Sequence, residues 1–299
     1  MRYAIRHRTT YRYAVAVDVA HHLAHLRPRA TPAQTVLSDE VLIEPAPMHI
    51  GEHVDHFGNR AAIFAIDRPH DEFDIESRAV VEVTAPAPVD AKATPPWQTL
   101  RDSLVADGFP LAVEAAEFIH PSPLVPHLAA ADDYARQIFS PGRPIVAAAL
   151  ALTEAINRDF AYEAGVTDTS TDLATVFSQR AGVCQDLAHA QIACLRSLGL
   201  AARYVSGYVR TYPRPGRPRR VGADASHAWV SAWCPTLGAP GEGRWIDIDP
   251  TNDLIVADEH VVLGWGRDYA DVSPVRGVIL GGGAHTLEVQ VELTPIGAG

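Results

Sequence analysis

One cysteine of the sequence lies where a thiol would be chemically activated. Cys184 follows Gly182 and Val183 and begins an apolar repeat of helical period, "GVCQDLAHAQIACLRSLGL". At the first turn of a helix, unpaired backbone N–H groups and the helix dipole stabilise a thiolate. A cysteine needed only for packing could lie anywhere on the apolar face of such a helix. The position of Cys184 therefore indicates reactivity.

A thiol nucleophile needs a base, and the base needs a group that fixes its orientation. His227 begins the predicted strand "SHAWVSAW", and Asp249 ends the following one, "RWIDIDP". If these strands are antiparallel neighbours, the start of one lies beside the end of the other, which brings His227 and Asp249 together. Asp247 shares a face of the strand with Asp249, because alternate residues of a strand point the same way. Periodicity alone leaves both aspartates open as candidates.

The elements that must position these side chains follow from the hydrophobic pattern. Apolar and polar residues alternate from residue 2 to residue 84, which predicts an antiparallel β region, and the Pro- and Ala-rich stretch "APAPVDAKATPP" is typical of a linker. We predict an N-terminal β domain over residues 1–85, a linker over 86–96 and a cysteine-bearing core over 97–299. The tail "HTLEVQVEL" alternates again and is assigned to that core as a final strand.

The core is predicted to be α+β. Helical patterns such as "PIVAAALALTEAINRDF" precede the cysteine helix, and three β-type runs follow it. Gly199 is expected to end the cysteine helix as a C-cap. A helix packed by one apolar stripe against an antiparallel sheet is an α+β arrangement. The stripe falls at offsets 3, 4, 7, 8, 11 and 14 from Cys184: Leu187, Ala188, Gln191, Ile192, Leu195 and Leu198.

Three segments together resemble the signature of a known family. "GVCQDLAHAQIACLRSLGLAARYVSGYV", "SHAWVSAW" and "RWIDIDPTN" are similar to the three motifs of the transglutaminase-like superfamily, whose core is a papain-type cysteine fold. The stretches "HRTTYRYA", "HLRPRA", "DHFGN" and "DRPH" resemble the β domain that precedes this core in many bacterial members. The resemblance implies Cys184 as nucleophile, His227 as general base and acid, and Asp249, favoured over Asp247 by its "DPTN" context, as the residue that orients His227.

The chemistry that follows is acyl transfer at an amide bond. The thiolate attacks the carbonyl carbon, His227 protonates the leaving amine, and a thioester remains for water or a second amine. Water makes the protein a peptidase or amidase, which we expect, and an amine makes it an acyltransferase; a catalytically inactive binding scaffold is the third alternative. The backbone N–H of Cys184 is the first expected oxyanion donor. Candidates for the second donor or for substrate contact are Tyr162, Gln185 and Trp229.

The composition of the chain limits the classes of partner that the protein is expected to bind. The net charge of −11 argues against nucleic acid, since phosphate binding needs a basic surface. No apolar run reaches the ~18 residues of a membrane span, and the N-terminus lacks a secretory pattern. An odd number of cysteines, three, indicates no disulfide framework and a reduced cytoplasmic protein, in which Cys194 and Cys234 serve packing. We expect a peptide or amide substrate and no cofactor, and the oligomeric state stays open.

For several other residues we expect a structural role rather than a chemical one, or leave the two open. No calcium loop of the D-x-D-x-D-G type is present. His189 is expected to be structural, and Asp186 and Asp224 to cap or brace local backbone. Two interpretations stay open for a set of residues after Asp249, which either line the cleft or serve packing and turns: Trp265, Tyr269 and the glycine run 281–283. Two also stay open for a cluster of arginines, which forms either a solvated loop or a positively charged rim that binds a substrate carboxylate: Arg214, Arg217, Arg219 and Arg220. Strand-borne histidines are interpreted as surface and hairpin residues rather than metal ligands: His21, His22, His25, His49, His53 and His56.

Overall fold

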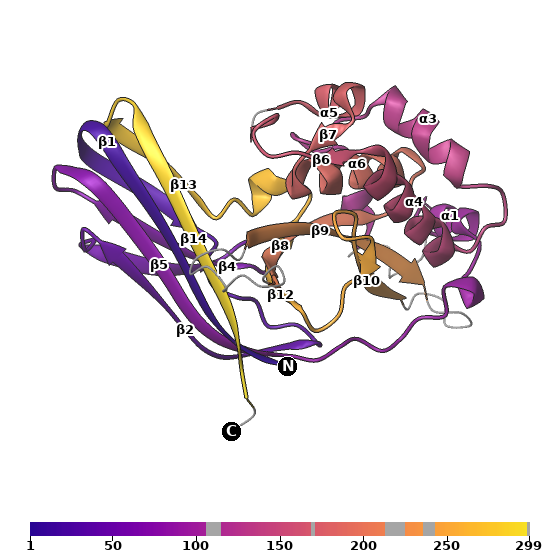
Figure 1. Ribbon diagram of the computed structural model, residues 1–299, viewed down its shortest axis with the longest axis horizontal. Helices are drawn as coiled ribbons and strands as arrows, with labels where there is room; N and C mark the ends of the chain where they lie inside the picture. Colours follow the sequence, from indigo (N-terminus) through magenta and orange to yellow (C-terminus); the bar gives the residue numbers. More distant parts are fainter. Residues whose placement is uncertain (106–114, 169–170, 213–224, 236–242, 298–299) are drawn as a thin grey trace.

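The computed structural model describes residues 1–105, 115–168, 171–212, 225–235 and 243–297, and it has two layers (Figure 1). One layer is a long, curved antiparallel sheet, and the other is a smaller sheet covered by helices. The mixture of antiparallel sheets and packed helices confirms the α+β class.

The large sheet is built around the 23-residue strand β1, whose alternating residues are buried, as the sequence pattern predicts. Its strands lie in the order β2-β5-β1-β4-β3, and β13 and β14 also pair with β1. The bounds are β1 Arg2–Ala24, β2 Gln34–Glu44, β3 His49–Val54, β4 Arg60–Ile66, β5 His70–Val83, β13 Val275–Gly281 and β14 His285–Ile296.

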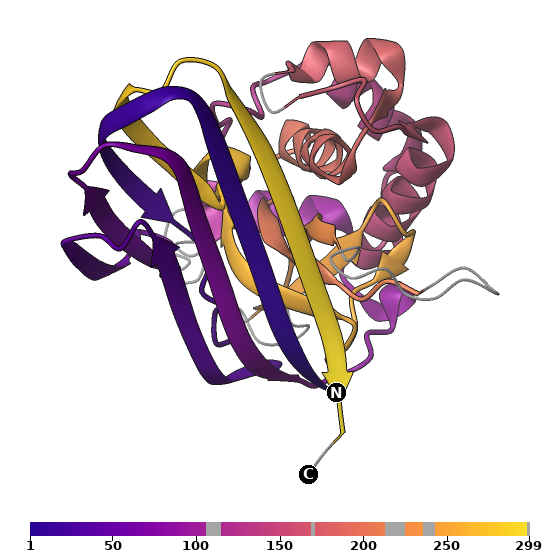
Figure 2. The same cartoon turned by 60° about the vertical axis from the view of Figure 1, so that its left-hand side comes forward.

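The C-terminal strands differ from expectation in the sheet they join. Residues 285–296 do form a strand, but β14 runs antiparallel to β1 from Arg2↔Ile296 to Tyr13↔His285 and belongs to the N-terminal sheet (Figure 2). Assigning this tail to the cysteine-bearing core was therefore wrong. The physical reason is that alternation predicts a strand without naming its partner, and Leu293, paired with Ile5, completes the apolar cluster of the large sheet.

The core layer places five strands beside a bundle of helices. Its strand order is β11-β10-β9-β8-β12, and a short parallel pair joins β6 to β7. The strands are β6 Ala161–Tyr162, β7 Ala181–Gly182, β8 Ala202–Val209, β9 Ala225–Pro235, β10 Gly243–Asp249, β11 Leu254–Ile255 and β12 His260–Gly266. The helices are η1 Ala91–Ala93, α1 Trp97–Val105, η2 Glu117–Ile119, α3 Ala129–Ile138, α4 Ile145–Asp159, α5 Leu173–Gln179, α6 Cys184–Ser197 and η3 Tyr269–Asp271.

Helix α6 is more deeply buried than its sequence pattern predicts. Every residue from Asp186 to Arg196 is buried, because α3, α4 and α5 pack on the sides of the helix that β8 and β9 leave free. Gly199, which follows the helix with φ of +74°, adopts the left-handed conformation of a C-terminal cap, as expected. The predicted apolar stripe is thus one part of a helix that is enclosed on all sides.

Arg196 anchors the C-terminal end of α6. Its guanidinium is buried and donates to the backbone oxygens of Phe118, Ala202 and Arg267 at 2.7 to 3.1 Å and to Ser122 Oγ at 3.1 Å. Burial lowers the pKa of Arg196 to about 10, so the group stays charged at neutral pH. The side chain therefore ties the helix to η2, to the start of β8 and to the segment before η3.

Replacing Arg196 by methionine should destabilise the protein by at least about 3 kcal/mol, because the buried carbonyl oxygens lose their donors at about 1–3 kcal/mol each. Chemical denaturation followed by circular dichroism measures this change. Arg196→Lys keeps the charge but has fewer donors, so its stability should lie between those of the wild type and the methionine variant. A methionine variant within 1 kcal/mol of the wild type would contradict the assigned role.

Candidate active site

The loop before Cys184 is held by a buried carboxylate. Asp186 Oδ2 accepts from the backbone N–H of Val183 at 2.8 Å and from Thr167 Oγ1 at 2.7 Å. Gly182 makes room for this contact, since a Cβ atom there would lie 2.6 Å from Asp186 Oδ2. The prediction that Asp186 braces backbone is confirmed, and the bracing sets the start of α6 at the cysteine.

Cys184 differs from the other two cysteines in its access to solvent. Cys184 is partly exposed, whereas Cys194 is 0% and Cys234 4% exposed. Burial disfavours a thiolate, so it raises the pKa of Cys194 strongly and that of Cys234 to about 11. The packing interpretation of these two residues is confirmed, and an external reagent meets Cys184 first.

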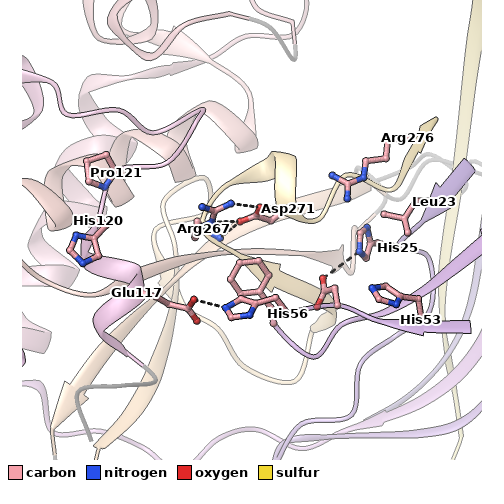
Figure 3. Close-up of a pocket in the computed structure, with 12 residues that line it drawn as sticks. Leu23, His25, His53, His56, Glu117, His120, Pro121, Arg267, Asp271 and Arg276 are labelled. Atoms are coloured by element: carbon pink, nitrogen blue, oxygen red, sulfur yellow. Dashed lines mark hydrogen bonds and ion pairs between the residues drawn. The ribbon is translucent and has the colours of Figure 1, made fainter. Parts of the chain in front are cut away.

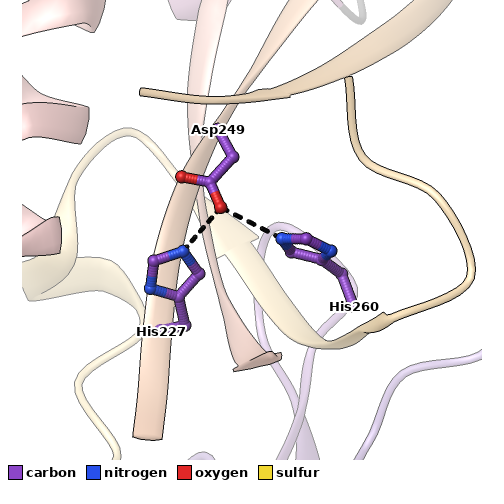
Figure 4. Close-up of side chains that lie close together, drawn as sticks. All are labelled: His227, Asp249 and His260. Atoms are coloured by element: carbon purple, nitrogen blue, oxygen red, sulfur yellow. Dashed lines mark hydrogen bonds and ion pairs between the residues drawn. The ribbon is translucent and has the colours of Figure 1, made fainter. Parts of the chain in front are cut away.

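His227 and Asp249 come together as the strand pattern predicted. Strands β9 and β10 are antiparallel neighbours, with Ile248 opposite Val230, and His227 Nε2 lies 2.7 Å from Asp249 Oδ2 (Figure 4). Asp249, rather than Asp247, is the partner of the histidine. Cys184 is one of the groups that raise the pKa of His227. Since Nε2 faces the carboxylate, Nδ1 is the nitrogen left for the sulfur.

The electrostatics of this group favour a charged imidazole. Burial alone would lower the pKa of His227, but hydrogen bonds and charge from Asp249 and Cys184 outweigh it and raise the pKa to about 9. Burial would likewise raise the pKa of Asp249, but hydrogen bonds from His227, His260 and Asn252 hold it well below its usual range. At neutral pH the pair is therefore an imidazolium and a carboxylate.

Asp249 receives more hydrogen bonds than the sequence indicated. Its Oδ1 accepts from the backbone N–H groups of Thr251 and Asn252 at 2.9 and 3.2 Å, and its Oδ2 accepts from Asn252 Nδ2 at 2.7 Å. These bonds form the Asx-type turn for which an aspartate before "PTN" is suited, so this sequence signal could have identified Asn252. The fully buried carboxylate is thus fixed from both of its oxygens.

A second histidine at this carboxylate was missed. His260 Nε2 lies 3.1 Å from Asp249 Oδ2, on the same oxygen that faces His227 (Figure 4). Metal-ligand-type atoms of His227, Asp249 and His260 lie within 4.8 Å of one another, so these are the residues of the described chain that could hold a cation. The nitrogen to oxygen separations of 2.7 and 3.1 Å are those of ordinary hydrogen bonds.

The three residues considered for oxyanion or substrate contact lie in different surroundings. Tyr162, on β6, is 58% exposed and pairs in register with Gly182. Burial and the charge of Cys184 both raise its pKa, which places the phenol near the thiol and keeps it protonated as a donor. Gln185 is partly exposed in the first turn of α6.

Trp229 does not line the site, contrary to expectation. Its side chain is fully buried, with its ring 6.2 Å from that of His227 and 5.2 Å from that of His260. Gly207 on the neighbouring strand permits this position, because a Cβ atom there would lie 2.5 Å from the indole. The indole supports the two histidines from inside the protein and cannot touch a substrate.

Of the other residues considered, His189 is structural, as expected. Its buried Nε2 accepts from the backbone N–H of Tyr269 at 3.2 Å, and burial lowers its pKa to about 4. The ring of Trp265 packs against two guanidinium groups, with Cζ of Arg29 and Cζ of Arg203 at 3.5 and 3.8 Å from the ring centroid. The glycine run 281–283 ends β13 in the N-terminal sheet. Asp224 and the arginines at 214, 217, 219 and 220 lie outside the described residues.

A cavity of about 580 Å³ lies between the two layers, lined by residues that include members of β1, β3, η2 and η3 (Figure 3). Across the cavity His56 Nε2 and Glu117 Oε2 share a hydrogen bond at 2.8 Å, Arg267 forms an ion pair with Asp271 at 2.9 Å, and Arg276 donates to the backbone oxygen of Ala270 at 3.2 Å. His56 and Glu117 come from different layers, so their hydrogen bond links the N-terminal sheet to the core. The cavity walls also include His25, His53 and His120.

The N-terminal histidines are only partly the surface residues that were predicted. His21, His49, His53 and His56 are exposed, but His22 and His25 are buried at 7% and 5% exposure. His22 stacks on Phe73 with ring centroids 4.5 Å apart, and burial lowers its pKa to about 4. The interpretation was wrong for these two because the end of β1, with His22, is covered by neighbouring strands, and His25, directly after β1, contacts the segment after η3.

Within the described part of the chain, no helix combines the length and apolar character that crossing a membrane requires.

The fold is α+β, with a cysteine at the start of the central helix of a transglutaminase-like core. Residues 3–82 match the family described as the bacterial transglutaminase-like N-terminal region, and residues 132–250 match the transglutaminase-like superfamily. The chain belongs to the transglutaminase-like superfamily.

Relatives extend over nearly the whole chain. An uncharacterized protein of Mycobacterium tuberculosis is 39% identical over 300 residues, covering 98% of this chain and 93% of that protein. An uncharacterized protein of Mycobacterium leprae is 32% identical over 296 residues, covering 98% of each. The crystal structure of a candidate cysteine protease from Cytophaga hutchinsonii superposes with a TM-score of 0.74 at 22% identity, covering 100% of this chain and 92% of the other, and so shares the fold.

Proposed function

We propose that the protein is a cysteine peptidase or amidase that cleaves an amide bond through a thioester intermediate. The observation that supports this most directly is the partly exposed Cys184 at the start of α6 together with His227, whose pKa Cys184 raises and whose Nε2 lies 2.7 Å from Oδ2 of the buried Asp249. These three side chains would thus supply the nucleophile, the general base and the group that orients the base, all of which acyl transfer by a cysteine needs.

The first half of the reaction forms the thioester. The Cys184 thiolate attacks the carbonyl carbon, and the negative charge that develops on the oxygen is stabilised by the backbone N–H of Cys184 and by the phenol of Tyr162. The C–N bond then breaks, and the leaving nitrogen takes the proton of the His227 imidazolium. The amine departs with that proton, and the acyl group stays on the sulfur.

The second half releases the acid. Neutral His227 takes a proton from water as the oxygen attacks the thioester carbonyl. The C–S bond breaks, which releases the carboxylic acid and restores the thiolate and imidazolium. A primary amine in place of water would give a new amide, so an acyltransferase needs the same residues and differs only in the second nucleophile.

The proposed substrate is a peptide or another amide, with no cofactor in the reaction. The charge of −11 gives no reason to expect nucleic acid as a partner. Three free cysteines suit a reducing compartment, which supports a cytoplasmic location.

The proposal is tested without knowing the substrate, by following iodoacetamide alkylation of each cysteine by mass spectrometry as a function of pH. Because His227 stays protonated up to a pH of about 9, its positive charge should keep the rate of Cys184 alkylation high at pH values well below the ~8.5 pKa of a free thiol. At pH about 6.5 it should exceed the rate of N-acetylcysteine at least ~10-fold. His227→Ala should remove both effects, and Cys194 and Cys234 should react slowly throughout.

A Cys184 that reacts no faster than N-acetylcysteine, with no effect of His227→Ala, would favour the inactive scaffold. If the thiol is activated, a mixture of short peptides incubated with and without a fluorescent primary amine separates the two reactions. Free acids as products support hydrolysis, and incorporation of the amine identifies the acyltransferase.

A further inference from the structure

We propose that His260 is a positioning residue of this site, which holds the Asp249 carboxylate and, through it, orients His227 toward Cys184. This inference rests on the function proposed above and deepens it. His260 is the first residue of β12 and lies in none of the sequence motifs.

The three side chains reach one point from separate parts of the core sheet. His227 comes from β9 and Asp249 from β10, while β12, which carries His260, lies at the opposite edge beyond β8. His260 nevertheless places Nε2 3.1 Å from Asp249 Oδ2, and the two imidazoles flank that oxygen (Figure 4). The chain that returns from β11 to β12 around the end of the sheet brings this contact about.

The contact fixes the direction of the hydrogen bond. An ionised carboxylate only accepts, so His260 must carry hydrogen on Nε2 and donate it to Asp249. His260 Nδ1 is buried and has no hydrogen-bond partner within the described part of the chain. The imidazole thus makes one side-chain hydrogen bond, aimed at the carboxylate that orients the proposed base.

Packing alone does not account for a histidine at this position. The ring is 4% exposed and lies edge-on to the buried Trp229, surroundings that an apolar side chain would fill without leaving a polar atom unpaired. Among the described residues, His260 leaves Nδ1 unpaired and donates from Nε2 to Asp249 Oδ2, the oxygen that also faces His227.

The test uses the pH profile of Cys184 alkylation, which a purely structural role would not alter. His260→Leu removes the donor and should lower the rate at pH about 6.5 about tenfold, as expected for loss of a hydrogen bond to a charged group, and make it rise with pH as for a free thiol. His260→Gln retains an N–H donor and should stay within about threefold of the wild type. His22→Leu, which removes another buried histidine outside the site, is the control and should match the wild type.

A leucine variant that keeps the wild-type pH profile would overturn the inference, even if its melting temperature falls. Nitrogen-15 NMR of the wild-type imidazoles gives a second test that needs no folded variant: His260 must carry hydrogen on Nε2, and a ring with a bare Nε2 could not donate to Asp249. A different result would contradict the proposed function itself: a Cys184 that is unreactive in the wild type, or a His227→Ala substitution that leaves the alkylation rate of Cys184 unchanged.

Discussion

Replacing Cys184 by alanine should lower amide cleavage by at least about 10³-fold, because no thioester can form without the sulfur. The fold should survive, since the side chain is partly exposed and Asp186, rather than Cys184, braces the loop before the helix. The measurement is product formation by wild type and variant from any peptide or amide that the wild type cleaves, with circular dichroism to verify folding.

Cys194→Ala is the matched control for this substitution. Cys194 lies on the same helix but is fully buried, so its loss should affect stability and leave the turnover rate nearly unchanged. If Cys184→Ala still cleaved the substrate at the wild-type rate, Cys184 would not be the nucleophile.

Replacing Asp249 by asparagine should lower kcat by about 10⁴-fold, as removal of the orienting carboxylate does in a related catalytic arrangement. Both carboxylate oxygens accept hydrogen bonds, from backbone N–H groups on one side and from His227, His260 and Asn252 on the other. An amide NH₂ group must face donors on either side, so the substitution disrupts the arrangement in both orientations. Without the negative charge the pKa of His227 falls, and the imidazolium is lost at neutral pH.

Asp247→Asn provides the comparison, because Asp247 lies on the same strand two residues away and is only partly buried. It should retain close to wild-type kcat and an unchanged pH profile. Equal losses from the two substitutions, or a larger loss from Asp247→Asn, would show that Asp249 is not the orienting residue.

The central arrangement could be predicted from sequence because it depends on local chain geometry. His227 and Asp249 lie on strands that are neighbours both in sequence and in the sheet, and Cys184 marks the first turn of a strongly patterned helix. His260 escaped prediction because its strand lies at the far edge of that sheet, and no spacing rule relates β12 to β10.

Two other differences have equally specific causes. Trp229 was considered for oxyanion or substrate contact, but its indole is fully buried, and Gly207 on the neighbouring strand leaves room for it there. The last strand was recognised but assigned to the wrong sheet, because alternation of apolar and polar residues carries no information about which strand lies alongside.

The pairing of β14 with β1 makes the cysteine-bearing core an insertion within the large sheet. Arg6 and Glu292, 286 positions apart, form an ion pair at 3.4 Å across these two strands. Contacts at such separation form slowly, because a long loop must close before they contribute. During synthesis β1 can pair early with β4 and β5, because these strands precede the core in sequence, whereas β14 is made after the core. The cysteine-bearing core therefore has all its own strands and helices before the large sheet can be completed.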